Sequence, residues 1–168
     1  MVAVRPAVPE DADSIAAIYR HYVLTGVATF EIEPPDRDEV LRRMSVATAA
    51  GLPYLVAEAD GEVLGYAYCS PWKTRPAYRS TVEDSVYVAP DATGRGVGGQ
   101  LLDALLAECL SAGIRQVIAV IVDADDASSL TLHRRRGFVD AGRLCAVGFK
   151  HGRWLDTVLL QKSLAQPG

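Results

Sequence analysis

The chain has 168 residues, 49% of them hydrophobic and 23% charged, which suffices for one globular domain with a substantial core. Its 17 Lys and Arg residues against 21 Asp and Glu residues give a formal net charge of −4, which argues against nucleic acid as a partner. Residues 1–6 lack the apolar stretch of a signal peptide, no later run is long enough to cross a bilayer, and the three cysteines have no metal-binding spacing. The composition therefore predicts a cytoplasmic protein of one domain, residues 1–168, without a metal.

The first half of the chain predicts three strands and two helices. An apolar stripe of helical period follows the helix-start residues 9–13, and a second stripe follows Pro34-Pro35-Asp36 and ends at Gly51. Asp60-Gly61 between two apolar runs is a strong hairpin signal. The expected elements are a strand at 2–5, a helix up to 23, a loop at 25–33, a helix at 34–51 and strands at 54–57 and 62–69.

The second half of the chain alternates strands and helices. A loop at 70–79 precedes a β-branched strand at 81–88, and the leucine-rich run at 101–110 has one apolar helical face. Residues 117–122 are apolar without alternation, as expected for a strand that is buried on both faces. The remaining expected elements are a helix at 128–136, strands at 144–149 and 154–160, and a frayed tail at 166–168.

A glycine-rich loop, Gly94-Arg95-Gly96-Val97-Gly98-Gly99, joins the strand at 81–88 to the next helix. Glycines let the backbone approach a ligand closely, and the free N–H groups and positive dipole end of a helix N-terminus suit an anion. We interpret the loop as a cradle for a diphosphate, with a flexible connection as the plainer alternative. Gly94-x-Gly96-x-x-Gly99 also matches the dinucleotide fingerprint, although five residues separate it from its strand, and Gln100 in place of lysine excludes a Walker A loop.

Several motifs together resemble those of a known family. Residues 95–102, Arg-Gly-Val-Gly-Gly-Gln-Leu-Leu, resemble the pyrophosphate loop of the GNAT acyl-CoA N-acetyltransferases. The motifs that resemble the phosphinothricin acetyltransferase-like branch of this family are Ala28-Thr29-Phe30-Glu31, Pro71-Trp72-Lys73-Thr74-Arg75, residues 81–88, Leu132-His133, Gly137-Phe138 and residues 148–154. The resemblance covers nearly the whole chain. It implies a single α/β domain with a mixed, mostly antiparallel central sheet flanked by helices, and it implies a homodimer.

The resemblance also implies a binding site for acetyl-CoA, the co-substrate of the family. The residues expected to hold it are Val86, Tyr87, Val88, Gly94, Arg95, Gly96, Val97, Gly98, Gly99, Asp126 and Ser129. A backbone N–H near Tyr87 or Val88 is expected to stabilise the charge on the thioester oxygen. Two positions depart from the family pattern, because Thr93 stands where Gln or Arg is usual, and Asp126 replaces an Asn and so removes a hydrogen-bond donor.

Acetyl transfer requires a base, because a free alkyl amine has a pKa of about 10 and is protonated at neutral pH. Glu83 is our candidate, since a polar site on a central strand is a common catalytic arrangement and the branch has a glutamate there as general base. The plainer alternatives are a surface glutamate or an ion-pair partner of Arg75 or Arg79. His133 stands where many family members have a tyrosine that protonates the leaving thiolate, and a catalytic and a structural role both stay open for it.

The amine substrate is expected to meet the loops at 70–79 and 25–33. Charge clusters are usually solvated surface, but paired cations beside aromatic residues also suit a small carboxylate or phosphinate. The resembled branch has similar residues there, which implies that Lys73, Arg75 and Tyr78 bind the substrate. Phe30 either plugs the core or forms a wall of the substrate site, and the resemblance favours the wall.

These residues together predict an enzyme that transfers acetyl directly from acetyl-CoA to the α-amine of a small amino-acid analogue. The resemblance implies analogues of the phosphinothricin, methionine sulfone or methionine sulfoximine kind. Acetylation of another amine, such as a protein N-terminus, and a non-catalytic acyl-CoA-binding module stay open. A nicotinamide-dependent oxidoreductase that uses Gly94-x-Gly96-x-x-Gly99 is the less favoured alternative.

Overall fold

The computed structural model describes residues 1–164, so the tail that we expected to fray, 166–168, lies outside the described residues. Helices and strands follow one another in the expected order. The helices are α1 (Ala12–Thr25), α2 (Arg37–Ala49), α3 (Val97–Ser111) and α4 (Ser128–Arg134). The strands are β1 (Ala3–Pro6), β2 (Tyr54–Ala59), β3 (Glu62–Pro71), β4 (Thr81–Val88), β5 (Gln116–Asp123), β6 (Val139–Lys150) and β7 (Arg153–Ser163).

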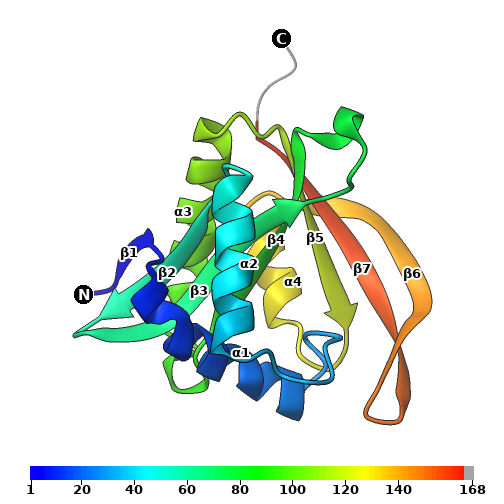
Figure 1. Ribbon diagram of the computed structural model, residues 1–168. Coiled ribbons are helices and arrows are strands. Elements are labelled where there is room, and N and C mark those ends of the chain that lie inside the picture. The colour runs from blue at the N-terminus through cyan, green and yellow to red at the C-terminus, as the bar shows by residue number, and fades with distance from the viewer. Residues whose placement is uncertain (165–168) are drawn as a thin grey trace.

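The seven strands of the described residues form one sheet in the order β1-β2-β3-β4-β5-β7-β6. The β4–β5 pair is parallel, and the five other pairs are antiparallel. Helices α1 and α2 cover one face of the sheet and α3 covers the other, with α4 beside β5 (Figure 1). This arrangement confirms the predicted mixed, mostly antiparallel sheet flanked by helices.

Alternation along β4 assigns its side chains to the two faces of the sheet. Val82 and Asp84 are buried on the side of α3 and α4. Glu83 and Tyr87 lie on the opposite side, where the Tyr87 ring is 5.1 Å from the ring of Tyr19 in α1. The two faces of this central strand therefore present different chemistry to the two helical layers.

Tyrosines fill much of the space between the sheet and α1. The rings of Tyr54, Tyr66 and Tyr68 stack nearly parallel, with centroids 4.9 to 6.2 Å apart, and the Tyr66 ring lies 5.5 Å from that of Tyr87. The other face is aliphatic, and its fully buried side chains include Leu101, Leu102, Leu105, Val82 and Val117. Aromatic packing on one face leaves hydroxyl groups there, which makes that side of the sheet the more polar of the two.

The expected boundaries differ from the observed ones mainly at β6. This strand begins at Val139 rather than at 144, and its register with β7 shifts between Asp140 and Gly142 and again between Leu144 and Gly148. An irregular edge strand lacks the strict alternation that marks a strand in sequence. Helix α4 ends at Arg134, two residues before its predicted end.

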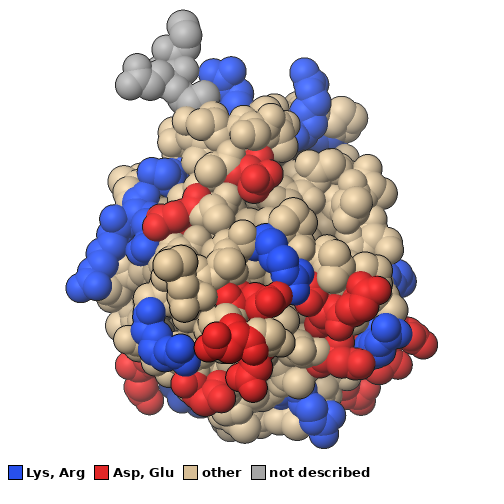
Figure 2. Space-filling model, turned by 90° about the vertical axis from the view of Figure 1, so that its left-hand side faces the viewer, with Lys and Arg blue, Asp and Glu red and all other residues tan. Residues whose placement is uncertain are grey.

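The surface shows a mixed distribution of charge on the face drawn in Figure 2. Acidic side chains gather in the lower half of this face, with basic ones among them. This face therefore lacks the continuous basic surface that nucleic-acid binding requires. None of the helices in residues 1–164 is long and apolar enough to cross a membrane.

Candidate active site

The central strands β4 and β5 separate in the middle of the sheet. They pair only over Thr81 to Glu83, whereas the pairing of β4 with β3 continues to Val88. Figure 1 shows the two strands diverging beyond this short pairing, with α4 seen between them. The ladder with β3 uses the backbone groups of alternate residues, so the N–H groups of Val86 and Val88 point towards β5, which pairs with neither residue within the described chain. An extended ligand can add to this free edge of β4.

The glycine-rich loop follows β4 after a short segment that contains the 3-10 turn Pro90–Ala92. Gly94 and Gly96 have φ angles of 75° and 78°, in the left-handed region that L side chains rarely adopt. Gly96 is the N-cap of α3, and its carbonyl accepts the N–H of Gln100. The N–H groups of residues 97–99 precede the first intrahelical bond, so they remain as donors at the positive end of the helix dipole. This geometry suits the predicted diphosphate cradle.

Gly98 and Gly99 have different surroundings. A Cβ atom on Gly98 would lie 3.5 Å from a Val88 methyl carbon, which is an ordinary contact. A Cβ atom on Gly99 would lie 2.2 Å from an Nη atom of Arg136, whose Nε donates to Asp103 at 2.8 Å. Gly99 therefore makes room for a side chain that ties the end of α4 to α3, while Gly98 lies beside β4.

Four more of the residues considered for acetyl-CoA lie near this separation or in the glycine-rich loop. Arg95 is exposed, and the Thr93 hydroxyl donates to the Pro90 carbonyl at 3.1 Å. Asp126 accepts the N–H of Ser128 at 2.9 Å at the start of α4, and Ser129 is half-buried in the first turn. The Asp126 carboxylate is thus already engaged by the backbone of α4, as a short polar side chain before a helix commonly is.

Glu83 lies half-buried on the tyrosine-rich face of the sheet. Burial raises the pKa of its carboxyl, the neighbouring charge of Asp84 raises it further, and Lys73 opposes the shift. Among the described residues it forms no ion pair with Arg75 or Arg79, so the alternative of an ion-pair partner is not observed. A carboxylate with a raised pKa is a better proton acceptor, which suits a general base.

His133 lies on the opposite side of β4 from Glu83 and is buried. Its Nε2 is 2.7 Å from Oδ2 of Asp84, and its Nδ1 is 2.7 Å from the carbonyl oxygen of Ser129. Both ring nitrogens therefore have partners, and the side chain links α4 to the strand β4. The ring also meets the edge of Phe138, with centroids 4.9 Å apart.

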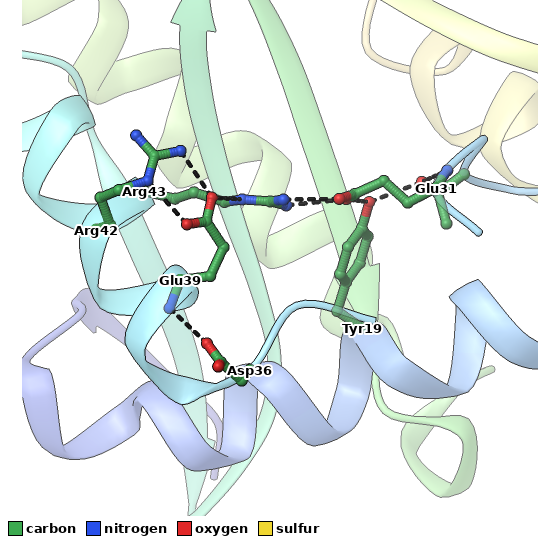
Figure 3. Close-up of polar contacts among 7 residues, drawn as sticks. Tyr19, Glu31, Asp36, Glu39, Arg42 and Arg43 are labelled. Carbon is green, nitrogen blue, oxygen red and sulfur yellow. Dashed lines mark hydrogen bonds and ion pairs between the residues drawn. The ribbon is translucent and has the colours of Figure 1, made fainter. Parts of the chain in front are cut away.

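The loop between α1 and α2 is held by a polar network that sequence reasoning did not find (Figure 3). Arg43 of α2 donates to both carboxylate oxygens of Glu31, at 2.9 and 2.6 Å. The Tyr19 hydroxyl of α1 contacts Glu31 and lies 2.7 Å from the Thr29 hydroxyl. The Arg43 guanidinium holds the pKa of Glu31 below its usual range. An acidic loop residue twelve positions before an arginine carries no recognisable sequence signal.

Phe30 stands within this loop, and its ring packs against β6, the edge strand of the sheet. A Cβ atom on Gly148 of β6 would lie 2.3 Å from Cζ of the Phe30 ring, so the ring rests directly on the glycine. Lys150 of β6 is buried and donates to the Thr29 carbonyl at 2.7 Å, and burial lowers the pKa of its ammonium. Phe30 is 37% exposed, so it covers Gly148 without being a plug of the core.

The predicted anion-binding residues of the loop at 70–79 are exposed. Arg75 precedes a short 3-10 turn, Pro76–Tyr78, and Tyr78, the last residue of that turn, is 43% exposed. The Lys73 ammonium lies 4.9 Å from the centroid of the Trp72 ring. These side chains share a loop, but the described contacts do not bring them together around one point.

The described residues contain no group of three or more His, Cys, Asp or Glu side chains that could hold a metal ion. The three cysteines are free thiols, with Cys69 and Cys109 buried and Cys145 exposed.

Comparisons with known proteins agree with this geometry. The model of the acetyltransferase (GNAT) family matches residues 15–138, which is more than half of the chain. Phosphinothricin N-acetyltransferase of Alcaligenes faecalis is 53% identical over 161 residues, which cover 96% of this chain and 82% of that protein. L-methionine sulfoximine/L-methionine sulfone acetyltransferase of Pseudomonas paraeruginosa is 39% identical over 163 residues, which cover 96% of this chain and 94% of that protein.

A solved structure shows the same fold. The crystal structure of a GNAT superfamily phosphinothricin acetyltransferase from Sinorhizobium meliloti, in complex with AcCoA, superposes with a TM-score of 0.92 at 48% identity. The match covers 96% of this chain and 88% of that one. The free edge of β4, the glycine-rich loop and the identity to named N-acetyltransferases lead to one conclusion: the chain belongs to the GNAT family of acetyltransferases and is an acyltransferase enzyme.

Proposed function

We propose that this enzyme transfers an acetyl group from acetyl-CoA to the α-amine of a small amino-acid analogue of the phosphinothricin, methionine sulfone or methionine sulfoximine kind. The observation that carries the proposal is the free edge of β4 beside the N-terminus of α3. The names of the relatives supply the substrate class.

Backbone groups account for the proposed binding of acetyl-CoA. The free N–H groups of Val86 and Val88 would bond the extended pantetheine arm, and the N–H groups of residues 97–99 would bond the diphosphate. Arg95 would add charge at the rim of the loop. Bound in this way, acetyl-CoA supplies the activated acetyl group at the end of β4 where Glu83 lies.

Glu83 is the proposed general base for direct transfer. It accepts the proton that the substrate ammonium must lose, so the neutral nitrogen forms its bond to the acetyl carbon while the bond between that carbon and sulfur breaks. A free N–H of β4 stabilises the negative charge on the thioester oxygen. His133 is the proposed proton donor to the leaving sulfur, and in the observed geometry its Nε2–H would have to leave Asp84 to reach that sulfur.

The substrate is proposed to lie between the two loops that we expected to bind it. Phe30 would wall the site, and Lys73, Arg75 and Tyr78 would meet its acid group. The electrostatic effect of Lys73 on Glu83 supports this placement, since the Lys73 charge lowers the pKa of the Glu83 carboxyl against the larger effect of burial.

Thiol release from acetyl-CoA across a panel of amines tests the proposal. We expect release with phosphinothricin, methionine sulfone and methionine sulfoximine, with a mass increase of one acetyl group on the amine. Release only with peptides would show an N-terminal acetyltransferase, and tight CoA binding without release would show a binding module. Equal rates with amines that lack an acid group would contradict the anion-binding loop, and binding of NAD in place of CoA would contradict the whole proposal.

We also propose a homodimer in the cytoplasm. Its support is the apolar surface of the β6–β7 hairpin, where Leu144, Val147, Phe149 and Trp154 are 48 to 68% exposed at the edge of the sheet. A patch of this kind is typical of a protein–protein interface. The free thiols Cys69, Cys109 and Cys145 suit a reducing compartment.

A further inference from the structure

The pair formed by Asp84 and His133 must hold one hydrogen more than a neutral imidazole beside a carboxylate. The Ser129 carbonyl can only accept, so the Nδ1 atom of His133, 2.7 Å away, carries a hydrogen. The Nε2 atom lies 2.7 Å from Oδ2 of Asp84, and a hydrogen is needed there too, since two lone pairs would repel each other. The structure therefore places a shared proton between the two side chains.

The pair is buried, so the shared proton decides whether the Asp84 carboxylate has a charged partner. The side chains of Asp84 and His133 are 0% and 5% exposed, and Oδ1 of Asp84 has no hydrogen-bond partner among the described residues. A lone carboxylate in such a place would be costly, because desolvation disfavours a charge without a partner. The imidazolium is the partner that makes the carboxylate tolerable.

The pair lies where the free edge of β4 begins. Asp84 is the first residue of β4 beyond the pairing with β5, and His133 comes from α4, four residues after Ser129. The contact thus joins two elements proposed to contact acetyl-CoA. Asp84 itself makes no contact on the face of Glu83.

We propose that Asp84 is a positioning residue for acetyl transfer, which holds the His133 ring by Nε2 and keeps it protonated at neutral pH. This inference rests on the proposed function, in which His133 donates a proton to the leaving sulfur. After donation the imidazole is neutral, and solvent returns the proton once the thiol has left. Asp84 thereby decides up to which pH the donor stays charged.

Among the groups around the pair, Asp84 is the one that raises the pKa of His133 most. Burial alone would lower the pKa of His133, but the hydrogen bond and charge of Asp84 outweigh it and raise the pKa. Arg136, two residues beyond the end of α4, opposes protonation of the ring. Cys69 of β3 lies opposite Asp84 in register, with its Sγ 3.2 Å from that of Cys109 in α3, and the pKa of the Cys69 thiol is raised well above its usual range. Glu83 is the adjacent charged residue, on the other face.

Asp84→Asn is the sharpest test, because it keeps the shape and removes the charge. The amide can donate to Nε2 of a neutral imidazole whose Nδ1–H still bonds Ser129. We expect the His133 pKa, followed by NMR of the labelled imidazole, to fall by about 1–3 units. The pH at which kcat for acetyl transfer falls on the alkaline side should decrease by the same number of pH units. Asp140→Asn, which removes the carboxylate of an exposed ion pair to Arg134 on the same helix, is the matched control and should move neither.

The wild-type titration gives a result even if Asp84→Asn does not fold. His133 carrying both ring hydrogens at pH 7 supports the proposal, and a singly protonated ring there overturns it. A His133 pKa that falls in Asp84→Asn while the kcat profile stays in place also overturns it, since Asp84 would then be purely structural. If the wild-type enzyme releases no thiol with any amine, the proposed function fails, while the imidazole titration still reports on the pair.

Discussion

Glu83 and His133 lie on opposite faces of β4, and this separation suits two groups that handle different protons. Glu83 stands among tyrosine hydroxyls, and burial raises the pKa of its carboxyl. His133 stands among apolar side chains on the α4 side, where its charge depends on Asp84. The two environments move both pKa values upwards, so the proposed base and the proposed acid differ in environment as well as in chemistry.

Replacement of the proposed base should affect catalysis rather than binding. Glu83→Gln keeps the shape of the side chain but cannot accept a proton, so we expect kcat to fall by about 10²–10⁴ with little change in the Kd of CoA. In the wild-type enzyme the raised pKa of Glu83 should place the acidic limb of kcat above the usual range of a glutamate. Steady-state rates over pH measure both effects, and wild-type turnover by Glu83→Gln at every pH would rule out the assignment.

The raised pKa of His133 also predicts how stability depends on pH. A group whose pKa is higher in the folded state than in the unfolded state binds its proton more tightly when folded, so its stabilisation is complete below the unfolded pKa of about 6.5. That stabilisation is lost as the pH rises through the folded pKa. Denaturant unfolding at a series of pH values should therefore show a fall in the free energy of unfolding above pH 6.5, and the fall should be smaller in His133→Gln. An equal fall in both proteins would contradict the raised pKa.

At the scale of elements, α3 and its preceding loop together form the proposed anion site. Gly96 ends the loop in a left-handed conformation that an L side chain would strain, and the helix begins at once with residues 97–99. The donors are backbone groups, so only a change that blocks access to them should abolish binding, whereas a change at the rim should weaken it.

Gly98→Val and Arg95→Ala should therefore weaken CoA binding to different degrees. The valine side chain would stand beside the Val88 methyl group, at the proposed diphosphate position, so we expect no measurable CoA binding and a nearly unchanged melting temperature. Loss of the exposed arginine should raise the Kd by about 10- to 100-fold at low salt, which corresponds to about 1.5–3 kcal/mol, and by less at high salt. Calorimetric titration with CoA measures both variants, and normal binding by a stable Gly98→Val would show that the loop is only a connector.

The loop between α1 and α2 is a second element whose position is set by remote contacts. Arg43, Tyr19 and Lys150 hold the residues on either side of Phe30. The ring itself rests on Gly148, where a methyl group would overlap it.

Gly148→Ala should consequently move Phe30 without touching the acetyl-CoA site. We expect the KM for the amine to rise several-fold while the KM for acetyl-CoA changes little, because the substrate wall shifts and the glycine-rich loop does not. Gly152→Ala, at a positive φ in the adjacent turn with open space around it, provides a control for strain in the same hairpin. Unchanged KM values for both substrates in Gly148→Ala would mean that Phe30 is not a wall of the site.

For the whole molecule, the sheet ends in the β6–β7 hairpin, which carries exposed apolar side chains. Phe149 and Trp154 face each other across β6 and β7, with ring centroids 5.0 Å apart, and both are more than half exposed. An apolar edge strand invites pairing with another copy of the chain.

A charge in this patch should dissociate the proposed dimer. Trp154→Glu places a carboxylate in the apolar surface, so we expect a monomer in sedimentation or light-scattering measurements, where the wild type is a dimer. Leu110→Glu, at an apolar residue of α3 that is 52% exposed, serves as the control and should remain dimeric. A monomeric wild-type protein would disprove the homodimer directly.

Local patterns in the sequence were sufficient for the order of the elements and for the glycine-rich loop. Interactions between near neighbours along the chain can be predicted from a short stretch of sequence. Examples are the 3.6-residue stripe of α1, the Asp60-Gly61 turn and the apolar run of β5. The positive φ angles of Gly94 and Gly96 belong to the same class, because a backbone conformation selects its residue locally. For these features the sequence alone determined the element and its local backbone conformation.

The tertiary structure alone decided which distant residues meet. Asp84 and His133 are 49 positions apart, Lys150 and Thr29 are 121 apart, and no periodicity relates either pair. Likewise, the pairing of β4 and β5 ends after Glu83, where the two strands diverge (Figure 1). Contacts between separate elements depend on how all the elements pack together, so the free edge of β4, the charge of His133 and the support of Phe30 emerge only when the sheet and its helices are assembled.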